Sequence, residues 1–245
     1  YGVNTSSISD IGRVDGLFAF NDESFNKMRI FTNNGSLKNC FDEFFKKCAS
    51  FDAVICSNDF AAVSLIRNLL KIAPDELNRL KILSCAQTKL SGYYKNMLTS
   101  VNMNFEQYGK AAVFIYEKLK AHPYMSGITV TVKWTGENEK TPQHKTVTVN
   151  NSESGYEFYA DGDMRNMLTA EQILNTCSDS DRLIIMSLIS GMTIEETAGH
   201  CFLTEGGVKY RIKRILNECK LSDKSELLTL LKDYLNPIIP KTPEL

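Results

Sequence analysis

Two hydrophobic patterns divide the chain. Up to about residue 121, apolar residues spaced three and four positions apart alternate with short, continuous apolar runs. The first spacing predicts amphipathic helices and the runs predict buried strands, and their alternation is typical of βαβ units on a parallel sheet. From Met164 onward only the helical spacing occurs. The pattern therefore predicts an α/β part followed by an all-α part.

Local signals place the elements of the first part. The predicted helices cover 6–20, 37–45, a stretch after Asp59, and 104–121. The strand-like runs are 28–32, 52–57 and 81–85. Ser36 is the expected N-cap of the second helix, and Pro74-Asp75 predicts a turn. Residues 127–134 and 145–151 alternate with a period of two, which predicts a hairpin with a long loop.

The second part has well-marked helix ends. A helix is predicted to follow Asp181 and to stop at Gly191, and Thr193 and Glu196 have the spacing of a capping box. That box begins a very short helix over 194–200. Thr204 is the expected cap of the next helix. The final helix carries one apolar stripe, formed by Leu227, Leu231 and Tyr234.

The helix over 204–219 is apolar on one face and basic on the other. Its apolar residues recur at intervals of four, three and four: Val208, Ile212, Ile215 and Cys219. The run 208–214 holds four cations and no anion, although the whole chain has a formal net charge of only −1. A solvated basic face would account for this pattern, and so would a surface for phosphate.

Chain length and the distribution of charge predict the domain organisation. With 245 residues, 43% of them hydrophobic, the chain is long enough for two domains. The stretch 151–163 holds four acids and no base, which marks the boundary. The predicted organisation is an α/β domain over 1–150, an acidic linker over 151–165 and a helical domain over 166–245.

Cysteines and histidines give no sign of a metal or a nucleophile. The seven cysteines contain no CxxC and mostly lie in apolar runs, so they are expected to be reduced core residues of a cytoplasmic protein. None of the three histidines has the context of a metal ligand or a catalytic base. No apolar run is long enough to span a membrane. We therefore expect no cofactor, no metal and no enzymatic activity.

Residues 178–235 resemble the LuxR-type (GerE-type) helix-turn-helix of bacterial transcription regulators. The resemblance rests on the run SDSDRLIIMSLISGMTIEETAGHCFLTEGGVKYRIKRILNECKLSDKSELL, with Asp181 and Gly191 at the family's acidic and glycine positions. It implies a four-helix unit that binds double-stranded DNA. The residues it assigns to DNA are Thr204, Lys209, Tyr210 and Lys213, with Arg211 and Arg214 as phosphate contacts. Thr197 departs from an aliphatic core position, and Gly207 departs from a threonine.

The stretch 51–119 resembles the effector-binding domain of LacI/GalR-type repressors, which is similar to periplasmic sugar-binding proteins. Ser57-Asn58-Asp59 matches the family's Asn-Asp at a strand end, and Arg13 matches its ligand-binding arginine. The resemblance implies an effector site of Arg13, Asn58 and Asp59 for a sugar-like or other small molecule. At 85–88 the family pattern fails, which removes one polar ligand contact. The resemblance also begins midway, so a partial domain without its N-terminal lobe is expected.

The leading hypothesis is a transcription regulator whose α/β domain senses a small molecule or dimerises. One recognition helix contacts few base pairs, so a homodimer is expected, with Leu227, Leu231 and Tyr234 either as its surface or as internal packing. A response regulator is the first alternative, in which Asp59 would be phosphorylated and Lys89 would follow a later strand. The second alternative is an enzyme of unknown class.

Overall fold

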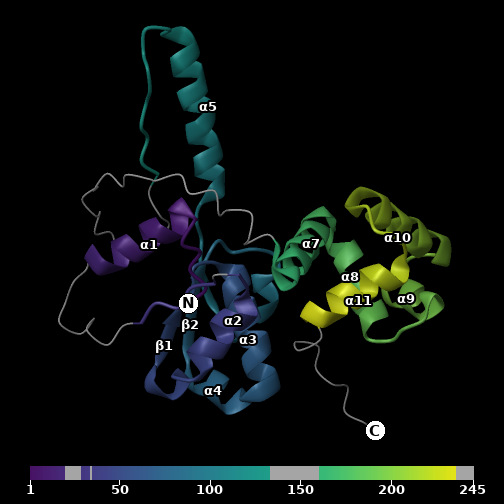
Figure 1. Cartoon of the computed structure of the whole chain (residues 1–245). Helices are drawn as coiled ribbons and strands as arrows, with labels where there is room; N and C mark the ends of the chain where they lie inside the picture. The colour runs from purple at the N-terminus through teal and green to yellow at the C-terminus, as the bar shows by residue number, and fades with distance from the viewer. Residues whose placement is uncertain (20–28, 34, 133–159, 236–245) are drawn as a thin grey trace.

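The computed structural model describes residues 1–19, 29–33, 35–132 and 160–235. The protein is a mixed α/β structure, mostly helical, with a small parallel sheet (Figure 1). An α/β body holds the sheet, and five helices, α7 to α11, lie together beside it. In the described part of the chain no helix is both long and apolar enough to cross a membrane.

The sheet consists of three parallel strands in the order β1-β2-β3: Ala53–Ile55, Lys81–Cys85 and Thr99–Val101. Ala53 pairs with Lys81, and Leu83 pairs with Thr99. Two short extended segments continue the sheet beyond β1. The Tyr1 amino group donates to the Ile55 carbonyl and the Ser57 N–H donates to the Tyr1 carbonyl, while Val3 forms a parallel bridge with Thr32.

The order across the sheet is therefore 31–33, 1–3, β1, β2, β3, all parallel. Numbered by their position along the chain, the segments have the order 2-1-3-4-5, as in a doubly wound α/β sheet. The strand order reverses between residues 1–3 and β1: the chain adds 31–33 on one side of residues 1–3 and adds β1, β2 and β3 on the other. The carboxyl ends of parallel strands share one edge. That edge, at the reversal, is where open α/β sheets bind small molecules.

The helices of the α/β body have the bounds α1 Ile8–Ala19, α2 Leu37–Phe45, α3 Asp59–Ile72, α4 Pro74–Arg79 and α5 Phe105–Ala121. Short 3-10 turns cover Cys48–Ser50 and Ser91–Tyr94. Ser36 caps α2 as predicted, because its side chain accepts the Asn39 N–H at 3.1 Å. Helix α3 packs on β2 and supplies much of the core, including Val63, Ile66 and Leu69.

The helical part has the bounds α7 Gly162–Thr176, α8 Asp179–Ile189, α9 Ile194–His200, α10 Glu205–Cys219 and α11 Lys224–Leu235. Capping boxes begin α8 at Ser178 and α9 at Thr193, the second as predicted. Gly191 ends α8 with a φ of +97°, which confirms the predicted left-handed stop.

Three expectations about the chain between the main helices need correction, and two extended segments were missed. Pro74 and Asp75 begin α4 rather than a turn, because proline fits the first helical position. Residues 127–132 form no strand, and 145–151 lie outside the described residues. Strand β3 and the segment 1–3 were not predicted. Helix α7 begins at Gly162, inside the stretch 151–165 that was expected to be a linker.

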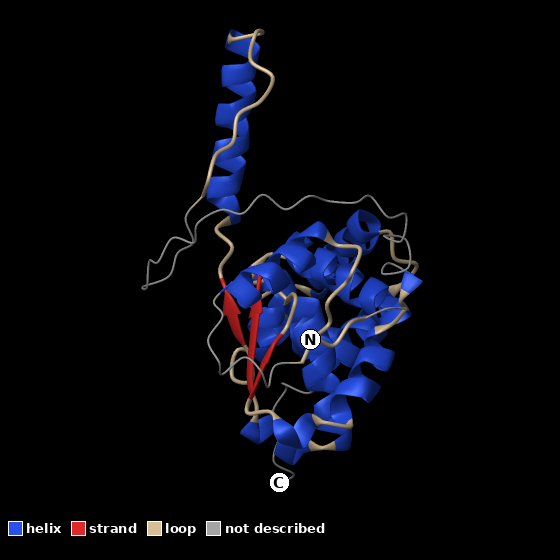
Figure 2. Cartoon of the chain, turned by 60° about the vertical axis from the view of Figure 1, so that its left-hand side comes forward, coloured by secondary structure: helices blue, strands red, loops and turns tan. Residues whose placement is uncertain are grey.

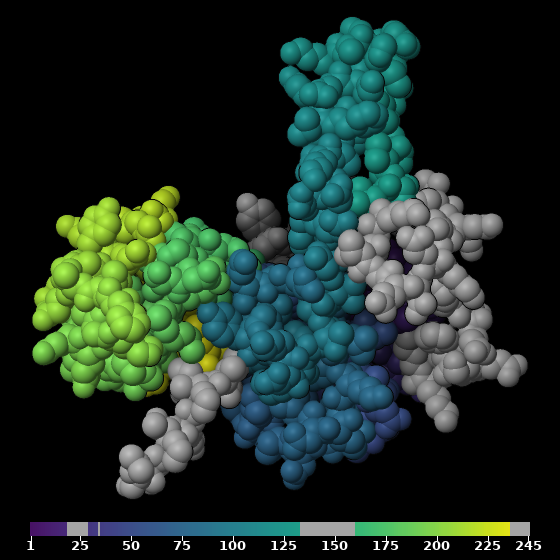
Figure 3. Space-filling model, turned by 180° about the vertical axis from the view of Figure 1, so that it is seen from behind, coloured from purple at the N-terminus to yellow at the C-terminus, as the bar shows by residue number. Residues whose placement is uncertain are grey.

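The α/β body and the helical part share one hydrophobic core. Phe44, Leu65 and Tyr94 belong to the same buried cluster as Met164 and Leu231. Figure 3 shows the two parts in contact from the opposite side. The apolar stripe of α11 is part of this core, since Leu227, Leu231 and Tyr234 are at most 2% exposed. The structure therefore assigns that stripe to internal packing and corrects its candidate role as a dimer surface.

Asp163, in the first turn of α7, forms the main polar contact between the two parts. Its carboxylate accepts from Ser64 Oγ at 3.0 Å, Arg67 Nη1 at 2.9 Å and Tyr234 Oη at 2.8 Å. The Arg67 guanidinium also lies 3.9 Å from the centre of the Tyr234 ring. The Arg67 side chain is mostly buried, so this carboxylate serves as its counter-ion.

We predict that Asp163→Ala lowers the free energy of unfolding by about 2 kcal/mol, because it leaves Arg67 without its anion. Urea denaturation followed by circular dichroism measures this change. The control is Asp179→Ala, whose side chain is 98% exposed and whose loss is expected to cost less than about 0.5 kcal/mol. Equal stability of the two variants would contradict the role of Asp163.

Candidate functional site

Helix α10 lies on the helical part through its apolar face. Val208, Ile212, Ile215 and Cys219 are all buried, as their spacing predicted. The Thr204 side chain accepts the Gly207 N–H at 3.1 Å and caps the helix. Leu203, just before the cap, packs in the same cluster as Val208, which is the arrangement of a hydrophobic staple. The start of α10 is therefore held by polar and apolar contacts together.

A buried carboxylate holds the basic side of α10 against α8. Asp181 has no exposed surface, and its Oδ1 accepts from Arg211 Nη1 at 2.9 Å while its Oδ2 accepts from Arg214 Nη2 at 2.5 Å. Ser178 supplies two further hydrogen bonds to Asp181, because its N–H and its hydroxyl donate to Oδ2 at 2.9 and 2.6 Å. One anion at the start of α8 thus fixes two turns of α10.

The pKa of Asp181 lies below its ordinary value. Burial alone would raise the pKa, but hydrogen bonds from Ser178 and Arg211 and the charge of Arg214 outweigh it. The same contact raises the pKa of Arg214, chiefly through the charge of Asp181. Both residues therefore stay charged through the neutral range.

The structure divides the predicted DNA-binding residues into two groups. Arg211 and Arg214 bind Asp181 and so hold α10 in place, and their expected phosphate contacts stay a prediction. Lys209, Tyr210 and Lys213 are exposed on the outer side of α10. Lys213 has no ion-pair partner in the described part of the chain. Lys209 pairs with Glu205 at 3.1 Å, a weak contact because both side chains are exposed.

The two departures noted in the sequence are visible in the structure. Thr197 is fully buried, and its Oγ1 finds no hydrogen-bond partner within the described residues. An unsatisfied buried hydroxyl of this kind costs about 1–3 kcal/mol. At Gly207 an added Cβ would lie 3.3 Å from Thr204 Oγ1, so a side chain there would press on the cap.

The turn before α10 contains a feature that sequence reasoning missed. Phe202 is 97% exposed and has a φ of +55°, in the left-handed region. Its N–H donates to the Gly199 carbonyl at 3.3 Å and the Leu203 N–H donates to Ala198 at 2.9 Å. These two bonds make a Schellman motif at the end of α9, and Phe202 occupies the position where glycine is usual. A side chain in this conformation costs about 1–2 kcal/mol.

The predicted effector residues all follow strands at one edge of the sheet. Arg13, on α1, donates to Asp10 at 2.7 Å, and Asp10 accepts the Asn4 N–H that follows the first extended segment. Arg13 and Asp10 also line a cavity of about 230 Å³ between α1 and β1. The pKa of Cys85, at the end of β2, is raised by burial, and the nearby charge of Arg13 opposes that rise.

Asp59 has a different environment from the one expected. It is fully buried, and its carboxylate accepts from Ser84 Oγ at 2.5 Å, Ser100 Oγ at 2.6 Å and the Thr88 N–H at 2.8 Å. Asn58 caps α3 through the Ala61 N–H at 3.0 Å. Asp59 therefore ties β2, β3 and the following loop together, and its expected direct contact with an effector stays a prediction.

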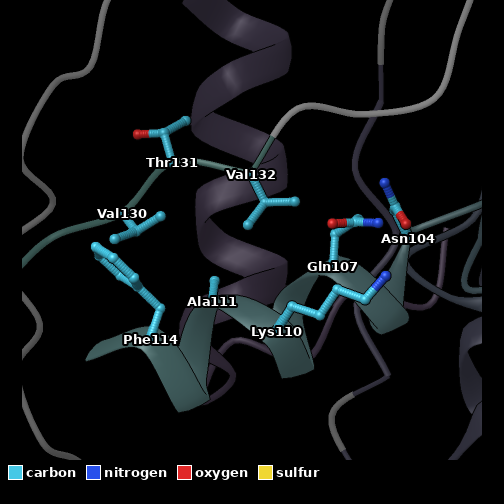
Figure 4. Close-up of a pocket in the computed structure, with 8 residues that line it drawn as sticks. All are labelled: Asn104, Gln107, Lys110, Ala111, Phe114, Val130, Thr131 and Val132. Atoms are coloured by element: carbon cyan, nitrogen blue, oxygen red, sulfur yellow. The ribbon is translucent and has the colours of Figure 1, made fainter. Parts of the chain in front are cut away.

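A second concave region contains none of the residues that the sequence predicted to bind DNA or an effector. It is a groove of about 450 Å³ between α5 and the extended residues 130–132. In Figure 4 the side chains of Phe114 and Val130 face each other at one end, and Gln107 and Asn104 lie at the other. No side chain of α5 is buried, and this helix projects from the body (Figure 2).

Comparison with known proteins gives no family assignment. The chain matches no model of a protein family, and no curated protein matches it significantly. Within the described residues, no group of three or more His, Cys, Asp or Glu side chains is placed to hold a metal ion. All seven cysteines are free and six are buried, as their positions in apolar runs predicted.

We predict that the stability supplied by Asp181 depends on pH with a definite sign. The folded-state pKa is lowered, so this stability is fully present above the unfolded pKa of about 4 and is lost as the pH falls through the folded pKa. The measurement is urea unfolding of the native protein and Asp181→Asn. The native protein is expected to be more stable at pH 7, with a difference that shrinks below about pH 4. A difference independent of pH would contradict this assignment.

Proposed function

We propose that the chain is a transcription regulator that binds double-stranded DNA through α10. The observation that carries the proposal is the outer side of α10, where Lys209, Tyr210 and Lys213 are exposed while the opposite side is buried. Short helix α9, a turn and α10 follow one another as in a helix-turn-helix, whose second helix enters the major groove. The resemblance of 178–235 to LuxR-type regulators supports the same function.

The α/β body is the proposed sensor. Residues 1–3 and 31–33 continue its parallel sheet beyond β1, and Arg13 lines the cavity between α1 and β1. This arrangement supports a ligand site, because doubly wound sheets bind small molecules where their strand order reverses. The similarity to LacI/GalR-type effector domains points to a small molecule there. Asp59 orders the sheet edge from within, so Arg13 is the proposed direct contact.

A structural link connects the proposed sensor edge to the helical part. The loop after β2 donates to Asp59 through the Thr88 N–H, and the next two N–H groups, of Lys89 and Leu90, donate to Glu171 on α7 at 2.9 and 2.7 Å. One loop thus touches both parts. A change at the sheet edge would reach α7 through these bonds.

The response-regulator alternative gains little support. The Asp59 carboxylate is buried and its oxygens are occupied by Ser84, Ser100 and Thr88, so a phosphodonor would have to displace these contacts.

A homodimer remains part of the proposal because one α10 covers few base pairs. Since the stripe of α11 is buried, the dimer would form through another surface.

We predict that reversing Lys209 and Lys213 to Glu weakens binding to a mixed-sequence duplex of about 30 base pairs by roughly 100-fold, because two cations facing DNA become anions. Fluorescence anisotropy at low salt measures the affinity, and circular dichroism checks the fold. Lys224→Glu with Lys232→Glu on α11 makes the same charge change elsewhere and is expected to have a much smaller effect. Equal loss in both double variants would argue against a site on α10.

We also predict that the affinity of the native protein falls steeply with salt. At least two phosphate contacts give a slope of about −2 or steeper in a plot of log affinity against log salt concentration. Lys213→Ala removes one contact and is expected to make the slope shallower by about 1. Anisotropy titrations between about 50 and 200 mM salt give both slopes. A flat response would mean that α10 meets no phosphate.

A further inference from the structure

Phe202 combines two energetically unfavourable features, and no contact in the described part of the chain offsets their cost. Its side chain is 97% exposed, and its backbone has the left-handed conformation that favours glycine. Its neighbours Cys201 and Leu203 both pack inward against the small cluster under α9 and α10. The Schellman motif therefore turns the ring out into solvent, directly before the cap of α10 at Thr204.

Two other helices of the same part end in the same motif and allow a comparison. At the end of α8 the position belongs to Gly191, and at the end of α10 it belongs to Lys220, whose charged side chain is at home in water. Phe202 alone of the three places a large apolar ring in solvent. Strained, exposed positions of this kind gather at functional sites.

We propose that Phe202 is a DNA-contacting residue, which packs its ring on deoxyribose carbons and thymine methyl groups at the edge of the major groove. This inference rests on the proposed function of α10. The first residues of a recognition helix approach the base edges, and Phe202 lies two residues before the cap of α10. Apolar side chains make contacts with thymine methyl groups in this groove. The contact adds affinity without adding charge.

Three variants separate the ring from the backbone strain. Phe202→Ala removes the ring and keeps the strained backbone, whereas Phe202→Gly removes the ring and relieves the strain. Lys220→Gly is the matched control, because it relieves the same strain at the end of α10 and leaves Phe202 in place. For each variant we would measure the thermal midpoint and the affinity for the mixed-sequence duplex across salt concentrations.

Both Phe202 variants are expected to bind about fivefold to tenfold more weakly, with an unchanged salt slope because no charge is lost. Phe202→Gly and Lys220→Gly are each expected to raise the thermal midpoint by roughly 2–4 °C, and Lys220→Gly to bind DNA as the native protein does.

Native affinity in both Phe202 variants, together with loss of binding in the Lys209 and Lys213 double variant, would overturn the role of Phe202 and leave the DNA-binding function standing. A shallower salt slope in Phe202→Ala would overturn the apolar contact. If the native protein itself fails to bind the duplex, the proposed function fails, and the role of Phe202 fails with it.

Discussion

The buried ion pair of Asp181 with Arg211 and Arg214 determines how α10 is presented. Burying a carboxylate is costly unless cations and donors surround it, and here two arginines and Ser178 do so. Because both arginines belong to α10, satisfying Asp181 also fixes the rotation of that helix. With this rotation, Val208 and Ile215 face the core while Lys209 and Lys213 face solvent. The exposed basic surface thus depends on an acidic residue inside.

The sequence predicted best where the signals are local. Capping residues such as Ser36, Thr193 and Thr204 marked helix starts correctly, because a cap bonds within its own turn. The sequence predicted structure poorly where an element depends on contacts with residues distant in the chain. The short segment 1–3 becomes part of the sheet only by pairing with β1, and its three residues carry no periodicity. Strand β3 is equally short.

The candidate site shows the same limit. The spacing of α10 correctly separated a buried face from an exposed one, but it could not show that Arg211 binds Asp181, which lies 30 residues away in the sequence. Asp59 was correctly placed at a strand end, yet its burial by Ser84 and Ser100 follows only from the packing of three strands. The outward ring of Phe202 depends on a backbone angle that no residue pattern specified.

The DNA-binding role of α10 is tested most directly by locating the DNA-contacting surface residue by residue. Nuclear magnetic resonance of the isotopically labelled chain, recorded before and after adding a mixed-sequence duplex, would show which residues change their chemical shifts. If α10 binds DNA, the largest changes are expected at the turn before α10 and on its outer side, around Thr204, Lys209 and Lys213. Changes centred on α5, or none at saturating duplex, would contradict this role.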